Sequence, residues 1–291
     1  MERTTSYLPT GIPRGSWTGV TVIDRTIDLQ ADPGRSGARS VGILGAGRAG
    51  TALAAAMRAA GREVDGPARR GSVPKGDLIL LCVPDAEIPV ASAAVAGTAP
   101  LVGHVSGATP LSALEPASRA GAAVFGMHPL QTLTGAAPEA LHGAGCAIGG
   151  STPEAARAAS DLARDVGMRP FALADHQRAA YHAAASVASN FLVTLEHAAE
   201  RIAAGAGLEA EQARALLAPL VRTTVESWAA LGPQDALTGP VARGDEATVR
   251  AQREAVGREA PELLALFDAL LEATRRLAAS RPDAVLVEAA A

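Results

Sequence analysis

Residues 40–61 read SVGILGAGRAGTALAAAMRAAG, and this stretch decides the fold class of the chain. It opens with an apolar run that predicts a buried strand, formed by Val41, Ile43 and Leu44. Three glycines follow in G-x-G-x-x-G spacing, Gly45, Gly47 and Gly50. The alanine-rich residues 51–60 then predict a helix that ends at Gly61. A strand, a glycine turn and a helix in this order are typical of a Rossmann-type parallel α/β sheet.

Each glycine of this turn has its own mechanical task. Gly45 permits the tight turn, Gly47 lets a pyrophosphate approach the backbone, and Gly50 lets the helix pack closely against the strand. The start of the helix offers unpaired N–H groups and the positive end of its dipole, which attract phosphate. The alternative is a plain glycine turn in an α/β domain. We predict that a dinucleotide binds along the loop Gly45, Ala46, Gly47, Arg48, Ala49 and Gly50.

Two arginines follow the second predicted strand, which covers residues 63–66. The dinucleotide fingerprint places an acidic residue about 20 residues past the glycines, where it binds the ribose 2′-hydroxyl of NAD. Here Asp65 lies early in the strand, and Arg69 and Arg70 come after it. Because guanidinium groups suit a 2′-phosphate, the sequence favours NADP(H) over NAD(H). The alternative is a pair of solvated loop arginines.

Several later strands end in residues that suit a ligand site. The nearly continuous apolar run at residues 77–84 predicts a central strand that is buried on both faces and ends at Pro84. Ligands bind at the carboxyl ends of parallel strands, so Val83 and Pro84 are predicted to contact the cofactor. Ser106 and His128 follow two further predicted strands, and we expect both near the reactive end of the cofactor. The alternative for His128 is a plain turn residue.

Composition and charge narrow the class of partner. With 291 residues, 48% of them hydrophobic, the chain can fill about two domains. The net charge of −4 and the scattered arginines argue against nucleic acid and favour a small-molecule partner. No apolar run reaches the ~18 residues of a membrane span, so we expect a soluble protein. Cys82 and Cys146 stand alone, which predicts no metal site and the reducing cytoplasm as compartment.

The chain divides by composition into three parts. Residues 1–39, rich in Thr, Gly, Pro, Arg and Asp, predict a flexible extension. Residues 40–174 predict the Rossmann-type domain. From Asp175 onward the pattern is helical only, so residues 175–291 predict an all-α domain. Its helices are expected at residues 175–205, 209–231, 245–257 and 260–279.

The first helix of the all-α domain carries a stripe of polar side chains. It has little charge between residues 181 and 195, which is typical of a buried helix. In a regular helix His182, Ser186 and Asn190 share one face. Buried polar groups need partners, so this stripe either lines a wet cleft or is satisfied internally.

A compact turn at residues 237–245 holds further candidates. Asp245 is expected to cap the helix that follows. Thr238 and Arg243 are either substrate contacts or parts of a structural turn with a solvated arginine.

Six separated motifs resemble a known group of proteins. They are, in order, GILGAGRAG, LCVPD, HVSGA, HPLQT, YHAAASVASNFLVTL and ALTGPVARGD. They are similar to bacterial Rossmann-like proteins whose C-terminal half is a domain of unknown function, DUF2520, within the superfamily of 6-phosphogluconate dehydrogenase and ketopantoate reductase. The resemblance implies an all-helical second domain that forms a homodimer, with nicotinamide in the cleft between the domains. It also implies reductase chemistry, on ketopantoate in some members and on pyrroline-carboxylate or imines in the wider clan.

One departure from that superfamily is visible in the residues. Ketopantoate reductases use a lysine on a helix of the second domain as proton donor, with an asparagine one turn later. This chain has a single lysine, Lys75, which precedes a strand of the first domain. The equivalent helix offers His182, Ser186 and Asn190 instead.

These observations predict an NADPH-dependent reductase that transfers a hydride to the C=O, or alternatively the C=N, of a small carboxylate metabolite. Histidine suits the protonation step because its ordinary pKa lies near neutral pH. His182 and His128 are the candidate acids, and Asn190 orients the carbonyl. Ser106 contacts substrate or nicotinamide, and Ser186 contacts substrate. A non-catalytic NADP-binding sensor or regulatory dimer is the alternative that the missing lysine suggests. A purely structural dimerisation protein is the third.

Overall fold

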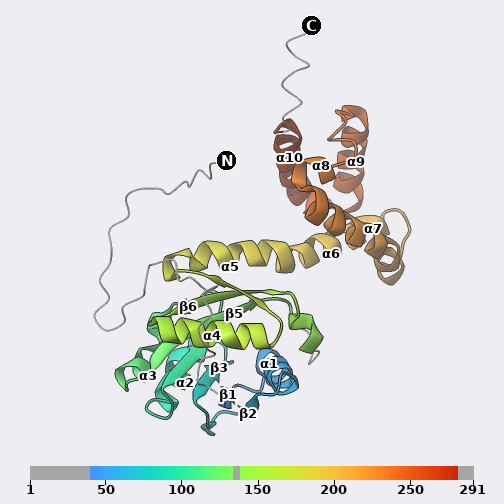
Figure 1. Cartoon of the computed structure of the whole chain (residues 1–291). Helices are drawn as coiled ribbons and strands as arrows, with labels where there is room; N and C mark the ends of the chain where they lie inside the picture. Colours follow the sequence, from blue (N-terminus) through green and yellow to red (C-terminus); the bar gives the residue numbers. More distant parts are fainter. Residues whose placement is uncertain (1–39, 134–137, 281–291) are drawn as a thin grey trace, which may run out of the picture. The chain divides into compact units, whose positions relative to one another are not determined.

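The computed structural model describes residues 40–133 and 138–280, in which a mixed α/β unit precedes a helical one (Figure 1). The predicted extension at residues 1–39 lies outside the described residues. Contacts divide the chain into two compact units after Val187. The sequence pattern becomes helical earlier, at Asp175, but the first helix after that point belongs to the α/β unit. The reason is that Arg178, near its start, is buried against the sheet.

Within the described ranges, seven strands form one sheet in the order β2-β1-β3-β4-β5-β6-β7. The strands are β1 (Ser40–Leu44), β2 (Glu63–Ala68), β3 (Leu78–Leu81), β4 (Leu101–His104), β5 (Ala123–Leu130), β6 (Gly145–Gly150) and β7 (Arg169–Ala172). All neighbouring pairs are parallel except β5 and β6. Strand β2 lies on one side of β1, and β3 lies on the other side. The boundary between β1 and β3 is therefore the topological switch point, where ligands bind in such folds.

Helices cover both faces of this sheet. The helices of the first unit are α1 (Arg48–Ala59), α2 (Ile88–Ala94), α3 (Glu115–Arg119), α4 (Pro153–Asp165) and α5 (Arg178–Ser186). One core contains Leu53 and Met57 of α1 and Leu162 of α4. The other contains Ile88 of α2 and Ala117 of α3. The predicted fold class, a Rossmann-type sheet domain followed by a helical domain, is confirmed.

Strand β5 is longer than its sequence predicts. The sequence places His128 after the strand, but the structure has it inside β5, aligned with Ala147 of β6. The expectation of a turn here is therefore wrong. The physical reason is that β6 pairs with β5 in the antiparallel direction and holds residues past the end of β4 in an extended conformation.

The second unit is helical. Its helices are α6 (Leu192–Ala204), α7 (Ala210–Leu231), α8 (Pro233–Ala236), α9 (Glu246–Glu259) and α10 (Leu264–Ala279). Asp245 caps α9 as predicted, because its carboxylate accepts a hydrogen bond from the Thr248 N–H at 3.1 Å. No helix in the described ranges is long and apolar enough to cross a membrane.

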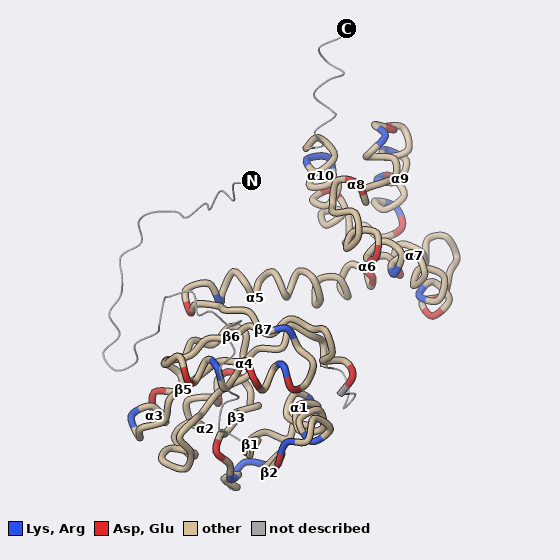
Figure 2. The backbone as a smooth tube through the Cα atoms, viewed as in Figure 1, with Lys and Arg blue, Asp and Glu red and all other residues tan. Residues whose placement is uncertain are grey.

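The predicted helix at residues 175–205 is not regular. It consists of a 3-10 turn, α5, a π-helical turn at Val187–Phe191 and α6. His182 and Ser186 lie one turn apart in α5. Asn190 lies in the π-helical turn, where the α-helical spacing assumed for the polar stripe does not apply. Residues 179–195 contain no Lys, Arg, Asp or Glu, and α5 is accordingly tan over nearly all of its length in Figure 2.

Candidate functional site

The glycine turn forms an open cradle between β1 and α1. Gly45 has a φ of +118°, and a side chain there would collide with the Cys82 carbonyl. A side chain at Gly50 would collide with the Gly45 carbonyl, so this glycine brings α1 close to the turn. By contrast, a Cβ at Gly47 would meet no described atom within 4 Å. The space above Gly47 is therefore open to a ligand.

The start of α1 has the properties of an anion site. Its N-cap is Gly47, which offers no side-chain cap, and its first turn contains no acidic residue. Ala46, Gly47 and Arg48 are exposed. Backbone N–H groups at an exposed helix start bind phosphate through hydrogen bonds and the helix dipole. The residues present fit the pyrophosphate of a dinucleotide.

The end of β2 lies beside this cradle. The Gly45 N–H donates to the Ala68 carbonyl at 2.8 Å, so Arg69 and Arg70 begin directly next to the turn. Both are exposed, and Arg70 forms an ion pair with Glu87. The Asp65 carboxylate instead accepts a hydrogen bond from the Lys75 backbone N–H at 2.7 Å. The position that would contact a ribose therefore offers guanidinium groups.

The strand ends line up along one edge of the sheet. The Cys82 N–H donates to the Leu44 carbonyl at 2.7 Å, and the Val105 N–H donates to the Leu81 carbonyl at 3.3 Å. His104 aligns with Gly126, so His128 extends beyond the end of β4. With strands about 4.8 Å apart, the row from β1 to β5 is about 14 Å long. The cradle and His128 thus lie at two ends of one row.

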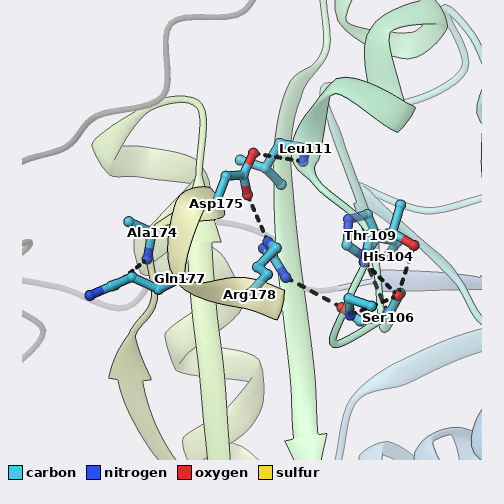
Figure 3. A network of polar contacts seen from close by, with 9 residues as sticks. His104, Ser106, Thr109, Leu111, Ala174, Asp175, Gln177 and Arg178 are labelled. Carbon is cyan, nitrogen blue, oxygen red and sulfur yellow. Dashed lines mark hydrogen bonds and ion pairs between the residues drawn. The ribbon is translucent and has the colours of Figure 1, made fainter. Parts of the chain in front are cut away.

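A buried arginine fixes the loop after β4 (Figure 3). The side chain of Arg178 is 2% exposed, and its Nε donates to Asp175 Oδ1 at 2.7 Å. Its Nη1 donates to the Ser106 carbonyl at 3.4 Å, while Asp175 Oδ2 accepts from the Leu111 N–H at 2.9 Å. Both ends of the loop are therefore tied to one short segment, which consists of the 3-10 turn that starts at Asp175 and the first residue of α5, Arg178.

Two glycines make room for this guanidinium. A Cβ at Gly126 would collide with Nη2 of Arg178, and a Cβ at Gly149 would lie 3.2 Å from the same atom. The two glycines are aligned partners on β5 and β6. Arg178 and Asp175 are absent from the candidates predicted from sequence. The available signal was one arginine, with an aspartate three residues before it, at the start of a helical stretch without other charges.

The Ser106 hydroxyl forms its hydrogen bonds within its own loop. It is 7% exposed, and its Oγ donates to Thr109 Oγ1 at 2.9 Å. The same oxygen accepts hydrogen bonds from the N–H groups of Ala108 and Thr109. In the described structure its hydroxyl shapes the turn, and the next residue, Gly107, lies against the histidines described below.

His104 is held neutral beneath this loop. Its Nδ1 accepts from the Ser106 N–H at 3.2 Å. Burial, and then the positive charge of Arg178, lower the pKa of His104 to about 3. Its Nε2 has no hydrogen-bond partner among the described residues. Sequence reasoning assigned this histidine only to a strand.

His128, Tyr181 and His182 form a cluster around Gly107. His128 Nδ1 and the Tyr181 hydroxyl are 2.7 Å apart, and the two rings meet edge to face at 5.5 Å. The ring centres of His128 and His182 are 6.0 Å apart. A Cβ at Gly107 would lie 2.8 Å from His182 Cδ2 and 2.9 Å from His128 Nε2. The structure thus brings two predicted histidines together and adds Tyr181, which sequence reasoning missed although it directly precedes His182.

Burial decides the protonation states in this cluster. Burial, then the charges of His182 and Arg178, lower the pKa of His128 to about 4, although Asp85 opposes the change. Burial raises the pKa of Tyr181 to about 12. At neutral pH the cluster therefore presents a neutral imidazole next to a protonated phenol.

Three predicted residues belong to the second unit. Asn190 is exposed in the π-helical turn. Thr238 and Arg243 are exposed in the turn before α9, which is closed by a hydrogen bond from the Asp245 N–H to the Pro240 carbonyl at 2.9 Å. Their roles, and that of Ser186 in α5, stay predictions.

Residues 144–274 match the family model described as domain of unknown function DUF2520. This stretch is a DUF2520 domain. It begins at the edge of β6 and reaches into α10, so the DUF2520 domain includes Arg178, Tyr181 and His182. The predicted resemblance to DUF2520 proteins is confirmed over these residues. No curated protein matches the chain.

Several solved structures share the fold of this chain. A Bacteroides fragilis protein proposed to be an NADP oxidoreductase has a TM-score of 0.68 at 19% identity, covering 82% of this chain and 98% of that one. A Thermotoga maritima protein has a TM-score of 0.66 at 20% identity, with the same coverage of 82% and 98%. A reductive aminase from Aspergillus terreus, solved with NADPH and ethyl-5-oxohexanoate, has a TM-score of 0.58 at 18% identity, covering 86% and 99%.

Proposed function

We propose that this protein is an NADPH-dependent reductase that transfers a hydride to the C=O of a small carboxylate metabolite, with a ketopantoate-like 2-keto acid as the substrate class. The observation that carries the proposal is the open cradle at Gly47, flanked by Arg69 where β2 ends. The similar structures solved with NADPH support the cofactor. C=N reduction is the second candidate. It is supported by the reductive aminase and by a similar solved structure, a Plasmodium falciparum pyrroline carboxylate reductase with NADP bound.

In this proposal each part of the sheet edge holds one part of the cofactor. The cradle binds the pyrophosphate, and Arg69 and Arg70 bind the 2′-phosphate. Val83 and Pro84, which follow β3, are proposed to contact the cofactor between the cradle and Gly107. When bound, the nicotinamide supplies the hydride. The protein orients it and excludes competing reactions.

Reduction of a carbonyl leaves an alkoxide that must be protonated. A positioned general acid typically contributes ~10²–10⁴ in rate. His128, Tyr181 and His182 lie together at the end of the row where the reactive end of the cofactor is proposed. Asn190, Ser186, Thr238 and Arg243 remain proposed contacts for the substrate.

The cofactor is tested by binding. Arg69→Ala should weaken NADPH binding about 10- to 100-fold, because a charged hydrogen bond is worth about 1.5–3 kcal/mol, and should leave NADH binding unchanged. Titration calorimetry measures both. Arg157→Ala, on the surface of α4, is the matched control and should bind NADPH like the wild type. Equal losses for NADPH and NADH would contradict the assignment of Arg69 to the 2′-phosphate.

The reaction is tested by NADPH oxidation with a panel of 2-keto acids and cyclic imines. Turnover of a 2-keto acid supports the proposal, and turnover of imines alone supports the second candidate. Binding of NADPH without turnover across the panel would favour a sensor. Absence of binding would favour a structural dimerisation protein.

We also propose a homodimer through the helical unit. One side of α7 carries large apolar side chains that are each more than half exposed, namely Leu216, Leu220, Trp228 and Leu231. Contiguous exposed apolar side chains of this size are typical of an interface. A second copy of the chain is the proposed partner.

A further inference from the structure

The His128–Tyr181 pair is held from several sides. The Tyr181 hydroxyl lies 2.7 Å from His128 Nδ1, within the range of a short hydrogen bond. The ring of Phe171, on β7, meets the Tyr181 ring at 5.9 Å. The two partners come from β5 and α5, and Arg178, one turn before Tyr181, anchors the start of α5. The phenol is therefore placed by strands and a helix, which position side chains better than loops do.

We propose that Tyr181 is the residue that protonates the substrate oxygen, with His128 supplying its replacement proton. This inference rests on the proposed function and assigns the acid to a residue other than the two histidines predicted from sequence. The hydroxyl can give its proton to the substrate, and His128 Nδ1 lies 2.7 Å behind it, where it can replace that proton.

The proton balance can be written through the two nitrogens of a neutral imidazole. Once the carbonyl carbon has received the hydride, the O–H bond of Tyr181 breaks and its proton goes to the substrate oxygen. The Nδ1–H of His128 then gives its proton to the phenolate oxygen, while Nε2 takes one from water. His128 stays neutral throughout and changes tautomer. The net reaction consumes one hydride and one proton from water.

The charges around the pair suit this role. The groups that face it are Arg178 and His182 on α5, Asp85 after β3, His104 on β4 and Cys146 on β6. The lowered pKa of His128 makes its imidazolium scarce at neutral pH, so it is a poor direct acid there. The raised pKa of Tyr181 keeps the phenol protonated until it is used.

The first test is Tyr181→Phe, which keeps the ring and removes the hydroxyl. Turnover should fall about 100- to 10,000-fold while the Kd for NADPH changes less than about twofold. Phe171→Leu is the matched control, because it alters the packing against the Tyr181 ring and removes no hydrogen-bonding group. Its turnover should stay within about threefold of wild type. Wild-type turnover in Tyr181→Phe would overturn the proposal.

A second measurement does not depend on turnover. In ¹⁵N spectra of the imidazoles, the Nδ1 resonance of His128, assigned through its loss in His128→Asn, should shift in Tyr181→Phe and stay in place in Phe171→Leu. An unchanged resonance would show that the hydrogen bond does not exist and would also overturn the proposal. If the wild type binds NADPH, shows this hydrogen bond and reduces nothing in the panel, the proposed function fails, and the catalytic role of Tyr181 falls with it.

Discussion

Arg178 is the residue on which the candidate site depends most. Its guanidinium is buried and joins Asp175 to the carbonyl of Ser106. Removing one partner of a buried ion pair typically costs about 3–5 kcal/mol, because the other charge is left uncompensated. The solvent exposure of Asp175, at 21%, moves the expectation to the lower end of that range.

We therefore predict that Arg178→Met lowers the free energy of unfolding by about 3 kcal/mol. Urea denaturation followed by circular dichroism measures this change. Arg119→Met serves as control because Arg119 forms an exposed ion pair with Glu115, and its loss should cost less than about 1 kcal/mol. Similar stabilities of the two variants would contradict the structural role of Arg178.

One buried and one half-buried histidine make the fold sensitive to acid. Folding holds the pKa values of His104 and His128 at about 3 and about 4, below the value of 6.5 expected in the unfolded chain. The unfolded state therefore binds more protons, and stability falls as the pH drops from about 6.5 toward 4. Above about pH 6.5 the contribution of both histidines to stability is fully present.

Between pH 6 and pH 5 each such histidine should contribute a slope approaching about 1.4 kcal/mol per pH unit. His104→Asn, whose side-chain oxygen can accept the Ser106 N–H, should remove one of the two contributions. Urea unfolding at closely spaced pH values measures the slope. A slope that is the same in wild type and variant would show that His104 titrates normally.

At the scale of elements, different glycines of the β1–turn–α1 unit serve stability and cofactor binding. Gly47 has a φ of −77°, which alanine adopts readily, and its Cβ would enter open space. We predict that Gly47→Ala changes the free energy of unfolding by less than about 0.5 kcal/mol but weakens NADPH binding at least about tenfold. Gly50→Ala should instead destabilise the fold, because its Cβ would strike the Gly45 carbonyl. Thermal unfolding and calorimetry on both variants distinguish the effects, and tight NADPH binding by Gly47→Ala would refute the cradle.

The same unit explains what could be predicted from sequence. The spacing of Gly45, Gly47 and Gly50 and the strand before them are local signals, and their geometry follows from sterics within a few residues. The length of β5 depends instead on its antiparallel pairing with β6, which no local pattern encodes. The π-helical turn at Val187–Phe191 likewise breaks a spacing that the sequence suggests. Tyr181 and Arg178 join the site only through contacts with residues 53 and 72 positions away, respectively.

At the scale of the whole molecule, the second unit buries little by itself. Its buried hydrophobic side chains within the described residues are few and small, namely Ala198, Ala213, Val249, Val256 and Ala260. The large side chains on one side of α7 remain exposed. A unit with so small a core gains stability when a partner covers its apolar face.

We predict that Leu220→Glu shifts the protein from dimer to monomer, because it places a charge in the proposed interface. Light scattering coupled to gel filtration measures the mass. Ala229→Glu introduces the same charge on the other side of α7 and should leave the dimer intact. A wild-type protein that is monomeric at micromolar concentration would refute the interface.

The ties between Arg178, Asp175 and the loop after β4 have a consequence for local unfolding. The 3-10 turn with Asp175 and the start of α5 with Arg178 cannot detach together without releasing the Leu111 N–H and the Ser106 carbonyl. These segments, far apart along the chain, should therefore open as a single cooperative unit. Hydrogen exchange would then give the amides of Ser106 and Leu111 the same opening free energy, and Arg178→Met would accelerate both together. The geometry of the candidate site and the docking of this segment would then depend on the same opening equilibrium.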